Sequence, residues 1–280
     1  MAYVEWLRVR RRLLVYAIIV GALVVLTVSP MLWGHGLVHG RDGHWSIGWT
    51  ADIGANSTDS HKFADAMRDA RIPLGLLLAV AAGVATLFTI FVARSLNAHF
   101  PSLDIAFTKP IGRERLALQF FAVDATAIAA AFGIALIVAL GFLALSGLLV
   151  GHLTAGPRTL LEGLCALGIP LMFYGTVQAA TAWVRGAATG FAAIATPLFV
   201  ILAPVTHTPF GPLVDAIVAL IRFFDPFVYL GQLVESIGTK MSGVQLAAGN
   251  AALVDTTVVV WALAAAMCAV AVASWKRLEA

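Results

Sequence analysis

The sequence predicts an all-α integral membrane protein with six transmembrane helices, and three observations lead to this fold class. The composition is 60% apolar and only 12% charged, with a mean hydropathy of +0.91, whereas soluble domains are about 25% charged. Six stretches of 20 or more residues contain no Asp, Glu, Lys or Arg, and about 20 apolar residues cross a bilayer as a helix. No long segment alternates between apolar and polar residues, as barrel strands would. So much apolar sequence also excludes a disordered chain.

The first element, residues 1–12, is expected to be a short helix that lies in the headgroup region. Trp6 and the cluster Arg10, Arg11 and Arg12 would anchor it, because tryptophan and arginine favour the membrane interface. A plain basic anchor without a helix is the alternative. The segment could also begin a cleaved signal peptide, but no A-x-A cleavage site follows, so we expect an uncleaved helix.

The six spans follow the charge-free stretches and are expected at about residues 13–33, 72–93, 122–150, 162–184, 187–206 and 254–275. An even number of crossings places both termini on one side. That side would carry eleven basic and five acidic residues, and the other side seven basic and ten acidic residues. Because the more basic side of a membrane protein is cytoplasmic, both termini are expected in the cytoplasm. The basic balance then reflects topology and anionic lipid, and nucleic acid is not expected as a partner.

Residues 34–71 are expected to form an outer loop, in which Trp45–Trp49 alternates like a short strand and 58–70 reads as a polar helix. The loop also holds three histidines, His35, His39 and His44. Nothing fixes them on one helix face, and no cysteine or carboxylate completes a ligand pattern. We therefore expect no metal site.

Residues 94–116 form the longest inner loop and predict a short helix, Ser102–Thr108. Ser102 is a favourable N-cap, Asp104 lies in the first turn and Pro110 ends the helix. Its apolar side chains are Leu103, Ile105 and Phe107. Exposed apolar residues on a capped helix favour docking to a partner over a loop that is merely solvated.

Polar side chains inside the spans are costly and are therefore candidates for function. Tyr174, Gln178 and Thr181 share one face of the fourth span, where they could line a polar pathway; hydrogen bonding between helices explains them equally well. Asp124 and Glu162 lie at the ends of spans and are expected to reach water. With no ionisable residue deep in a span, the sequence argues against a carrier driven by protons or sodium.

Two further features of the spans concern packing and pairing. Glycines four residues apart, at Gly147–Gly151 and Gly186–Gly190, permit helices to approach closely. Cys165 and Cys268 lie at different depths, so no disulfide is expected.

The last outer segment, residues 207–250, is apolar but interrupted by charges. Asp225 and Pro226 break it in the middle, which predicts two short helices, Pro212–Phe224 and Phe227–Ile237. We expect both to dip partly into the outer leaflet, where irregular backbone must pack against protein.

Catalytic motifs are absent from the sequence. It contains no G-x-x-x-x-G-K-[ST] nucleotide loop, no G-x-S-x-G elbow, no H-E-x-x-H and no C-x-x-C. We therefore expect no enzyme activity, no catalytic residue and no cofactor bound by this chain.

The inner loop reads Leu103-Asp104-Ile105-Ala106-Phe107-Thr108-Lys109-Pro110-Ile111-Gly112-Arg113. This segment resembles the cytoplasmic loop of permease subunits of ABC-type exporters of the type-2 (type V) class, which reads approximately L-D-x-L-L-x-x-P-[VI]-S-R. The L-D pair, the Pro-Ile pair and Arg113 match, and Gly112 replaces the serine. The order of elements is similar as well, and Asp225-Pro226-Phe227-Val228-Tyr229 resembles the Pro-aromatic segment of that family.

The resemblance implies one permease domain over residues 1–280, with an N-terminal elbow helix, a cytoplasmic coupling helix and outer re-entrant helices. It also implies two permease copies, identical or homologous, and two separate ATPase subunits that bind ATP and Mg²⁺ at a prokaryotic cytoplasmic (inner) membrane. The coupling residues would be Ser102, Leu103, Asp104, Phe107, Lys109, Pro110 and Arg113. ATP binding would push this helix and reorient the spans, exporting a substrate that the sequence does not identify.

Two other functions stay open. A secondary carrier or channel would work without an ATPase and would require a buried acid such as Asp124. A membrane scaffold would transport nothing, and it would leave the capped inner helix unexplained.

Overall fold

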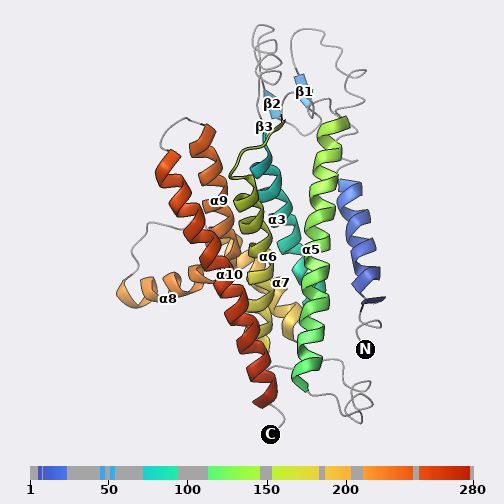
Figure 1. Ribbon diagram of the computed structural model, residues 1–280, viewed down its shortest axis with the longest axis vertical. Helices are drawn as coiled ribbons and strands as arrows, with labels where there is room; N and C mark the ends of the chain where they lie inside the picture. Colours follow the sequence, from blue (N-terminus) through green and yellow to red (C-terminus); the bar gives the residue numbers. More distant parts are fainter. Residues whose placement is uncertain are drawn as a thin grey trace.

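A computed structural model of the chain shows an elongated bundle of helices (Figure 1). It describes residues 6–7, 9–23, 45–47, 51–53, 72–93, 113–145, 153–182, 187–202, 211–241 and 246–277. Residues 9–23 are helical, and they are followed by α3 (Leu74–Val92), α5 (Arg113–Leu145), α6 (Thr159–Thr181), α7 (Ala187–Leu202), α8 (Pro212–Phe223), α9 (Pro226–Met241) and α10 (Leu246–Arg277). The helix over 9–23 begins, and α10 ends, at the same end of the bundle, which we call the terminal end (Figure 1).

Within the described residues, four helical segments are long and apolar enough to cross a membrane, namely Leu74–Val92, Ala117–Gly141, Thr159–Thr181 and Ala251–Ser274. The chain is therefore a multi-pass membrane protein. α7 is apolar but shorter, and the predicted first span continues past residue 23, outside the described part of the chain. α5 begins nine residues before the predicted start of span three, because its first turns continue the helix through the charged stretch from Arg113.

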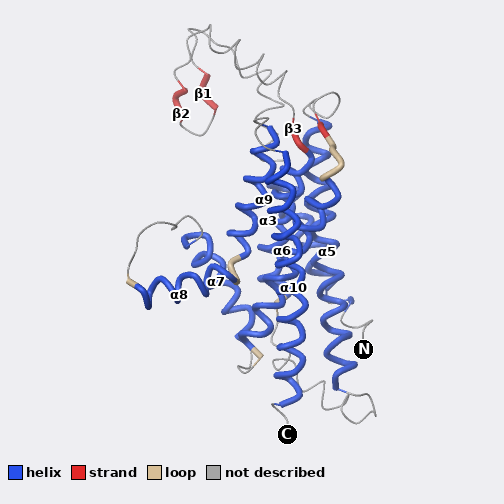
Figure 2. The backbone as a smooth tube through the Cα atoms, turned by 60° about the vertical axis from the view of Figure 1, so that its left-hand side comes forward, coloured by secondary structure: helices blue, strands red, loops and turns tan. Residues whose placement is uncertain are grey.

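Four short strands lie at the opposite end of the bundle, which we call the strand end (Figures 1 and 2). β1 (Trp45–Ile47) pairs antiparallel with β2 (Ala51–Ile53), which confirms the strand expected in this loop. β3 (Ile72–Pro73) pairs in parallel with β4 (Leu153–Thr154), a pairing that the sequence did not predict. This second pair holds the starts of α3 and α6 side by side.

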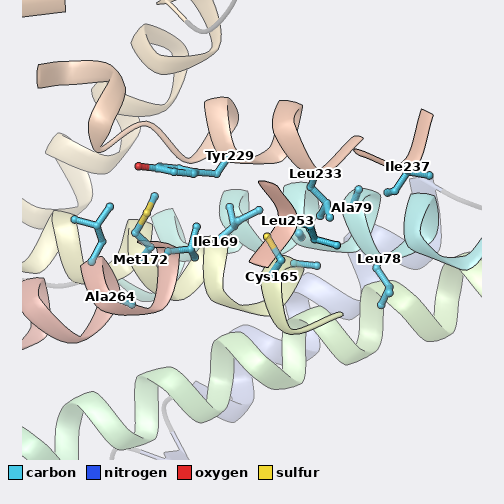
Figure 3. Close-up of a cluster of buried hydrophobic side chains, with 14 residues drawn as sticks. Leu78, Ala79, Cys165, Ile169, Met172, Tyr229, Leu233, Ile237, Leu253 and Ala264 are labelled. Carbon is cyan, nitrogen blue, oxygen red and sulfur yellow. The ribbon is translucent and has the colours of Figure 1, made fainter. Parts of the chain in front are cut away.

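α3 and α6 form the centre of the bundle, with 61% and 67% of their spanning windows buried, against 28% for those of α5 and α10. Small residues explain the central place of α3, since Ala81, Ala82 and Ala85 are fully buried. Figure 3 shows part of the core, where Cys165, Ile169 and Met172 of α6 meet side chains of α3, α9 and α10. The same small residues that lower the cost of close packing in membranes therefore build this core.

α6 and α10 approach each other most closely at two glycines of α6. A Cβ on Gly168 would lie 2.7 Å from Val260 Cγ1 and 3.0 Å from Trp261 Nε1. A Cβ on Gly175 would lie 3.2 Å from the Ala264 carbonyl oxygen. By contrast, a Cβ on Gly190, in the predicted glycine pair of α7, would meet nothing within 4 Å in this chain.

The helix over residues 9–23 packs lengthwise on the bundle. Its buried side chains recur every three or four residues and lie in one cluster with α3 and α5: Val9, Leu13, Tyr16 and Val20. The Arg12 guanidinium donates a hydrogen bond to the Phe91 carbonyl oxygen in the last turn of α3. Residues 9–12 continue into residues 13–23 without a break, so this part of the predicted interfacial segment belongs to the packed helix.

Candidate functional site

The junction between α8 and α9 is built around Asp225 and Tyr229. α8 ends at Phe223, and Pro226 begins α9, which confirms the predicted break at Asp225-Pro226. Asp225 Oδ1 accepts a 2.8 Å hydrogen bond from the Phe227 N–H and so caps α9, and the Tyr229 hydroxyl donates a 2.9 Å bond to the Phe223 carbonyl oxygen. The proline fits the first helical position because it has no N–H to leave unpaired. We call this group the α8–α9 corner.

Asp225 is fully buried, an uncommon position for a carboxylate. Its second oxygen, Oδ2, has no hydrogen-bond partner within the part of the chain that the structure describes. The Phe227 N–H and the positive charge of Arg222 act on this carboxylate, which protein otherwise encloses.

The position of the corner along the bundle follows from the packing of α9 on α3. A Cβ on Gly83 would touch Leu230, and one on Gly75 would touch Ile237, so the two helices run antiparallel in close register. Continuing this register by five residues puts Asp225 at the level of Phe88, one turn before the end of α3. The corner lies in the half of the bundle nearer the terminal end.

This position differs from the predicted one, in which both short helices dipped from the strand side. α9 does run to the strand end, but the corner and α8 do not lie there. The physical reason is that α9 presents apolar residues along much of its length, including the buried Tyr229, Leu233 and Ile237, and buries them by packing antiparallel to α3.

α7 is oblique to the bundle. Its Thr189 hydroxyl donates a 2.7 Å hydrogen bond to the Ala93 carbonyl oxygen at the end of α3. Phe199, three residues before the end of α7, still contacts Phe173 beyond the midpoint of α6, with ring centroids 6.1 Å apart. The described part of α7 therefore does not reach the strand end, although the predicted fifth span was expected to cross.

A second polar centre lies between α5 and α6. The Tyr174 hydroxyl donates a 2.6 Å hydrogen bond to Asp124 Oδ2, and the Tyr174 ring contacts Phe121 edge to face. Gln178 and Thr181 follow on the same side of α6 and are each 3% exposed. The three predicted pathway residues of α6 are thus packed inside the chain, and Tyr174 makes an interhelical hydrogen bond.

The burial of Asp124 and Glu162 corrects the expectation that both reach water, since their exposed fractions are 6% and 2%. Asp124 is buried because α5 starts early, at Arg113, so this residue lies three turns inside the helix. Glu162 lies in the first turn of α6, where the helix dipole favours an acid, and its carboxyl carbon would be 2.9 Å from a Cβ on Gly75. A side chain at position 75 would therefore displace the Glu162 carboxylate.

The predicted coupling residues Ser102, Leu103, Asp104, Phe107, Lys109 and Pro110 lie outside the described residues, as do His35, His39 and His44. Arg113 is the first residue of α5. Of the predicted anchor, Trp6 is partly exposed, Arg10 and Arg11 are exposed and Arg12 contacts α3. Over the described ranges, no three His, Cys, Asp or Glu side chains lie together as a metal site would require, and both cysteines are free.

Comparison of the chain with protein-family models, with curated proteins and with solved structures finds no match. The assignment of function therefore rests on the residues and their arrangement.

Sequence reasoning missed two groups in these sites, the buried Asp124 carboxylate and the Gly75–Glu162 contact. The predicted span begins at 122, which puts Asp124 at the membrane interface, although the charged residues from 113 onwards alternate with good helix formers. A helix extended back through that stretch puts Asp124 several turns from its end. Nothing in the local sequence indicates that Gly75 faces Glu162.

Proposed function

We propose that the chain is the permease subunit of an ATP-driven exporter, which a separate ATPase subunit powers. The observation that carries the proposal is the segment Leu103–Arg113, whose sequence resembles the ATPase-contacting loop of such permeases. The segment connects α3, which ends at Val92, to α5, which begins at Arg113. The break between α8 and α9 before the last span agrees with the resemblance, whereas the position of α8 away from the strand end differs from it.

The packing of α3 suggests how a displacement of the Leu103–Arg113 segment would be transmitted to the other helices. α3 contacts α5, α6, α7 and α9, so a displacement of its end at Val92 would act on most of the bundle. The end of α3 is also held by Arg12, through the Phe91 carbonyl, and by Thr189, through the Ala93 carbonyl. A coupling segment attached there would act directly on the helix over residues 9–23 and on α7. ATP and Mg²⁺ would bind to the partner ATPase, and two permease copies would form the pathway.

Co-purification and a triple substitution test this function. The full chain, tagged and expressed in its source cell, should retain an ATPase subunit through purification. Leu103→Ala, Asp104→Ala and Phe107→Ala together should abolish ATP-driven transport and weaken retention of the ATPase, while the amount inserted in the membrane stays unchanged. Replacing the exposed lipid-facing Ile137, Leu118 and Val258 by alanine gives a matched control with the same number of substitutions. Unchanged ATP-driven transport in the loop variant would reject the coupling role.

A secondary carrier or channel is the second candidate, and the buried Asp124–Tyr174 pair favours it. Ionisable groups inside a membrane bundle often mark ion or proton pathways. This function predicts flux in vesicles that contain only the chain, driven by an ion gradient. Asp124→Asn should abolish that flux, and the loop variant should not affect it. If Asp124→Asn leaves gradient-driven flux unchanged, the second candidate fails.

A further inference from the structure

α8 carries two opposite stripes of side chains. Leu213, Ile217 and Leu220 recur at helical spacing and are 75%, 50% and 61% exposed. Asp215 and Arg222 are two turns apart and fall on the other side of the helix. This strongly amphipathic pattern, whose apolar stripe is exposed, differs from that of the spanning helices, which have no comparable division into an apolar and a charged side.

α8 also differs in direction and depth. Both Figure 1 and Figure 2 show it projecting sideways from the bundle, across the direction of the other helices. Its last turn packs on the cluster formed by α3, α6 and α7, since Ile221 lies against residues that include Ala93 and Phe199. The register of α9 on α3 puts the corner about four residues, or roughly 6 Å, before the end of α3. Arg12, whose guanidinium is hydrogen-bonded to the Phe91 carbonyl oxygen, places a positive charge at the end of α3, where the membrane interface is expected.

We propose that α8 is an interfacial helix that binds the lipid leaflet at the terminal end of the bundle. Amphipathic helices of this kind bury their apolar face about 5–10 Å below the headgroups, which is the depth of the corner. Leu213, Ile217 and Leu220 then lie among acyl chains, and Asp215 and Arg222 lie among headgroups. The exposed apolar face of α7, with Ile194 71% and Ile201 64% exposed, continues this lipid-facing surface.

The proposal changes the path of the chain through the bilayer. α7 begins near the terminal end, and α8 projects from the same half of the bundle. α9, which reaches Gly75 at the strand end through Ile237, then makes the crossing that α7 was expected to make. This inference does not depend on whether the protein is an exporter, because it concerns only where the chain meets lipid.

Site-directed nitroxide labels on the full chain in lipid vesicles test the placement. Single cysteines at Ile217 and Asp215 are labelled in a variant in which Cys165 and Cys268 are alanine, and collisions with oxygen and with a water-soluble nickel chelate are compared. The label at 217 should collide mainly with oxygen, as a label at Ile137 in the exposed face of α5 should. The label at 215 should collide mainly with nickel.

Sidedness completes the test. A membrane-impermeant maleimide should reach Asp215→Cys from the same side as Arg115→Cys on α5, and from the side opposite to Thr154→Cys in β4. Labelling of Asp215→Cys from the side of Thr154 would overturn the proposal. Shielding of the 217 label from both collision reagents, with spin–spin coupling between copies, would overturn it in favour of contact with a second copy of this chain.

Discussion

At the scale of single residues, the buried carboxylates have different neighbours. Asp124 accepts a hydrogen bond from a tyrosine of another helix, whereas Asp225 caps the helix that follows it and leaves one oxygen without a partner among the described residues. A charge in a low-dielectric interior is tolerated only where hydrogen bonds offset its desolvation. The Asp124 carboxylate should therefore depend on the Tyr174 hydroxyl, and the Asp225 carboxylate on the Phe227 N–H.

Tyr174→Phe should lower the free energy of unfolding by about 1–2 kcal/mol, because it removes a donor from a buried carboxylate. Reversible unfolding in mixed detergent micelles, followed by circular dichroism, measures the change. Tyr229→Phe is the matched control, since its hydroxyl donates to a neutral carbonyl, and it should cost less. In an Asp124→Asn background the effect of Tyr174→Phe should shrink; an undiminished effect would show that the tyrosine acts through other contacts.

At the scale of elements, the sequence contained the break at Asp225-Pro226 and the approximate positions of the apolar helices. Both follow from local chemistry, since proline cannot continue a helix and charge-free stretches favour the membrane. The depth of the corner was not predictable, because it depends on the register in which α9 packs along α3. The predicted glycine pairs also differ from the glycines that bring α6 and α10 together, Gly168 and Gly175.

Gly168→Ala should destabilise the chain by about 1–3 kcal/mol, because the added methyl group would overlap with Val260 and Trp261. Gly133→Ala is the control, since a Cβ there meets nothing within 4 Å, and better helix propensity should make it neutral or stabilising by up to about 1 kcal/mol. The melting temperatures of the two purified variants, each compared with the parent chain, measure these effects. Equal stability of both variants would mean that α6 and α10 move apart at little energetic cost to accommodate the methyl group.

At the scale of the whole molecule, the two ends of the bundle differ in kind. Arg10, Arg11 and Arg12 lie at the terminal end, where α5 starts at Arg113 and α10 finishes at Arg277, and the short strands lie at the other end. Basic residues are retained on the cytoplasmic side during insertion. The terminal end should therefore face the cytoplasm.

In intact cells, Thr154→Cys should react with an impermeant maleimide, whereas Arg115→Cys should react only after the membrane is permeabilised. Both variants are made with Cys165 and Cys268 replaced by alanine. The reverse pattern would place the strand end in the cytoplasm, and the segment 94–112 would then be unable to meet a cytoplasmic ATPase.

The parallel pairing of β3 with β4 has a mechanical consequence. Two backbone segments about 80 residues apart in the chain are fastened together where α3 and α6 begin, at Ile72 with Leu153 and Pro73 with Thr154. Within the described residues, no strand pair joins α3 and α6 at their opposite ends, Val92 and Thr181. If α3 and α6 separate, they therefore pivot at the strand end, and the gap between the two helices is widest at the terminal end.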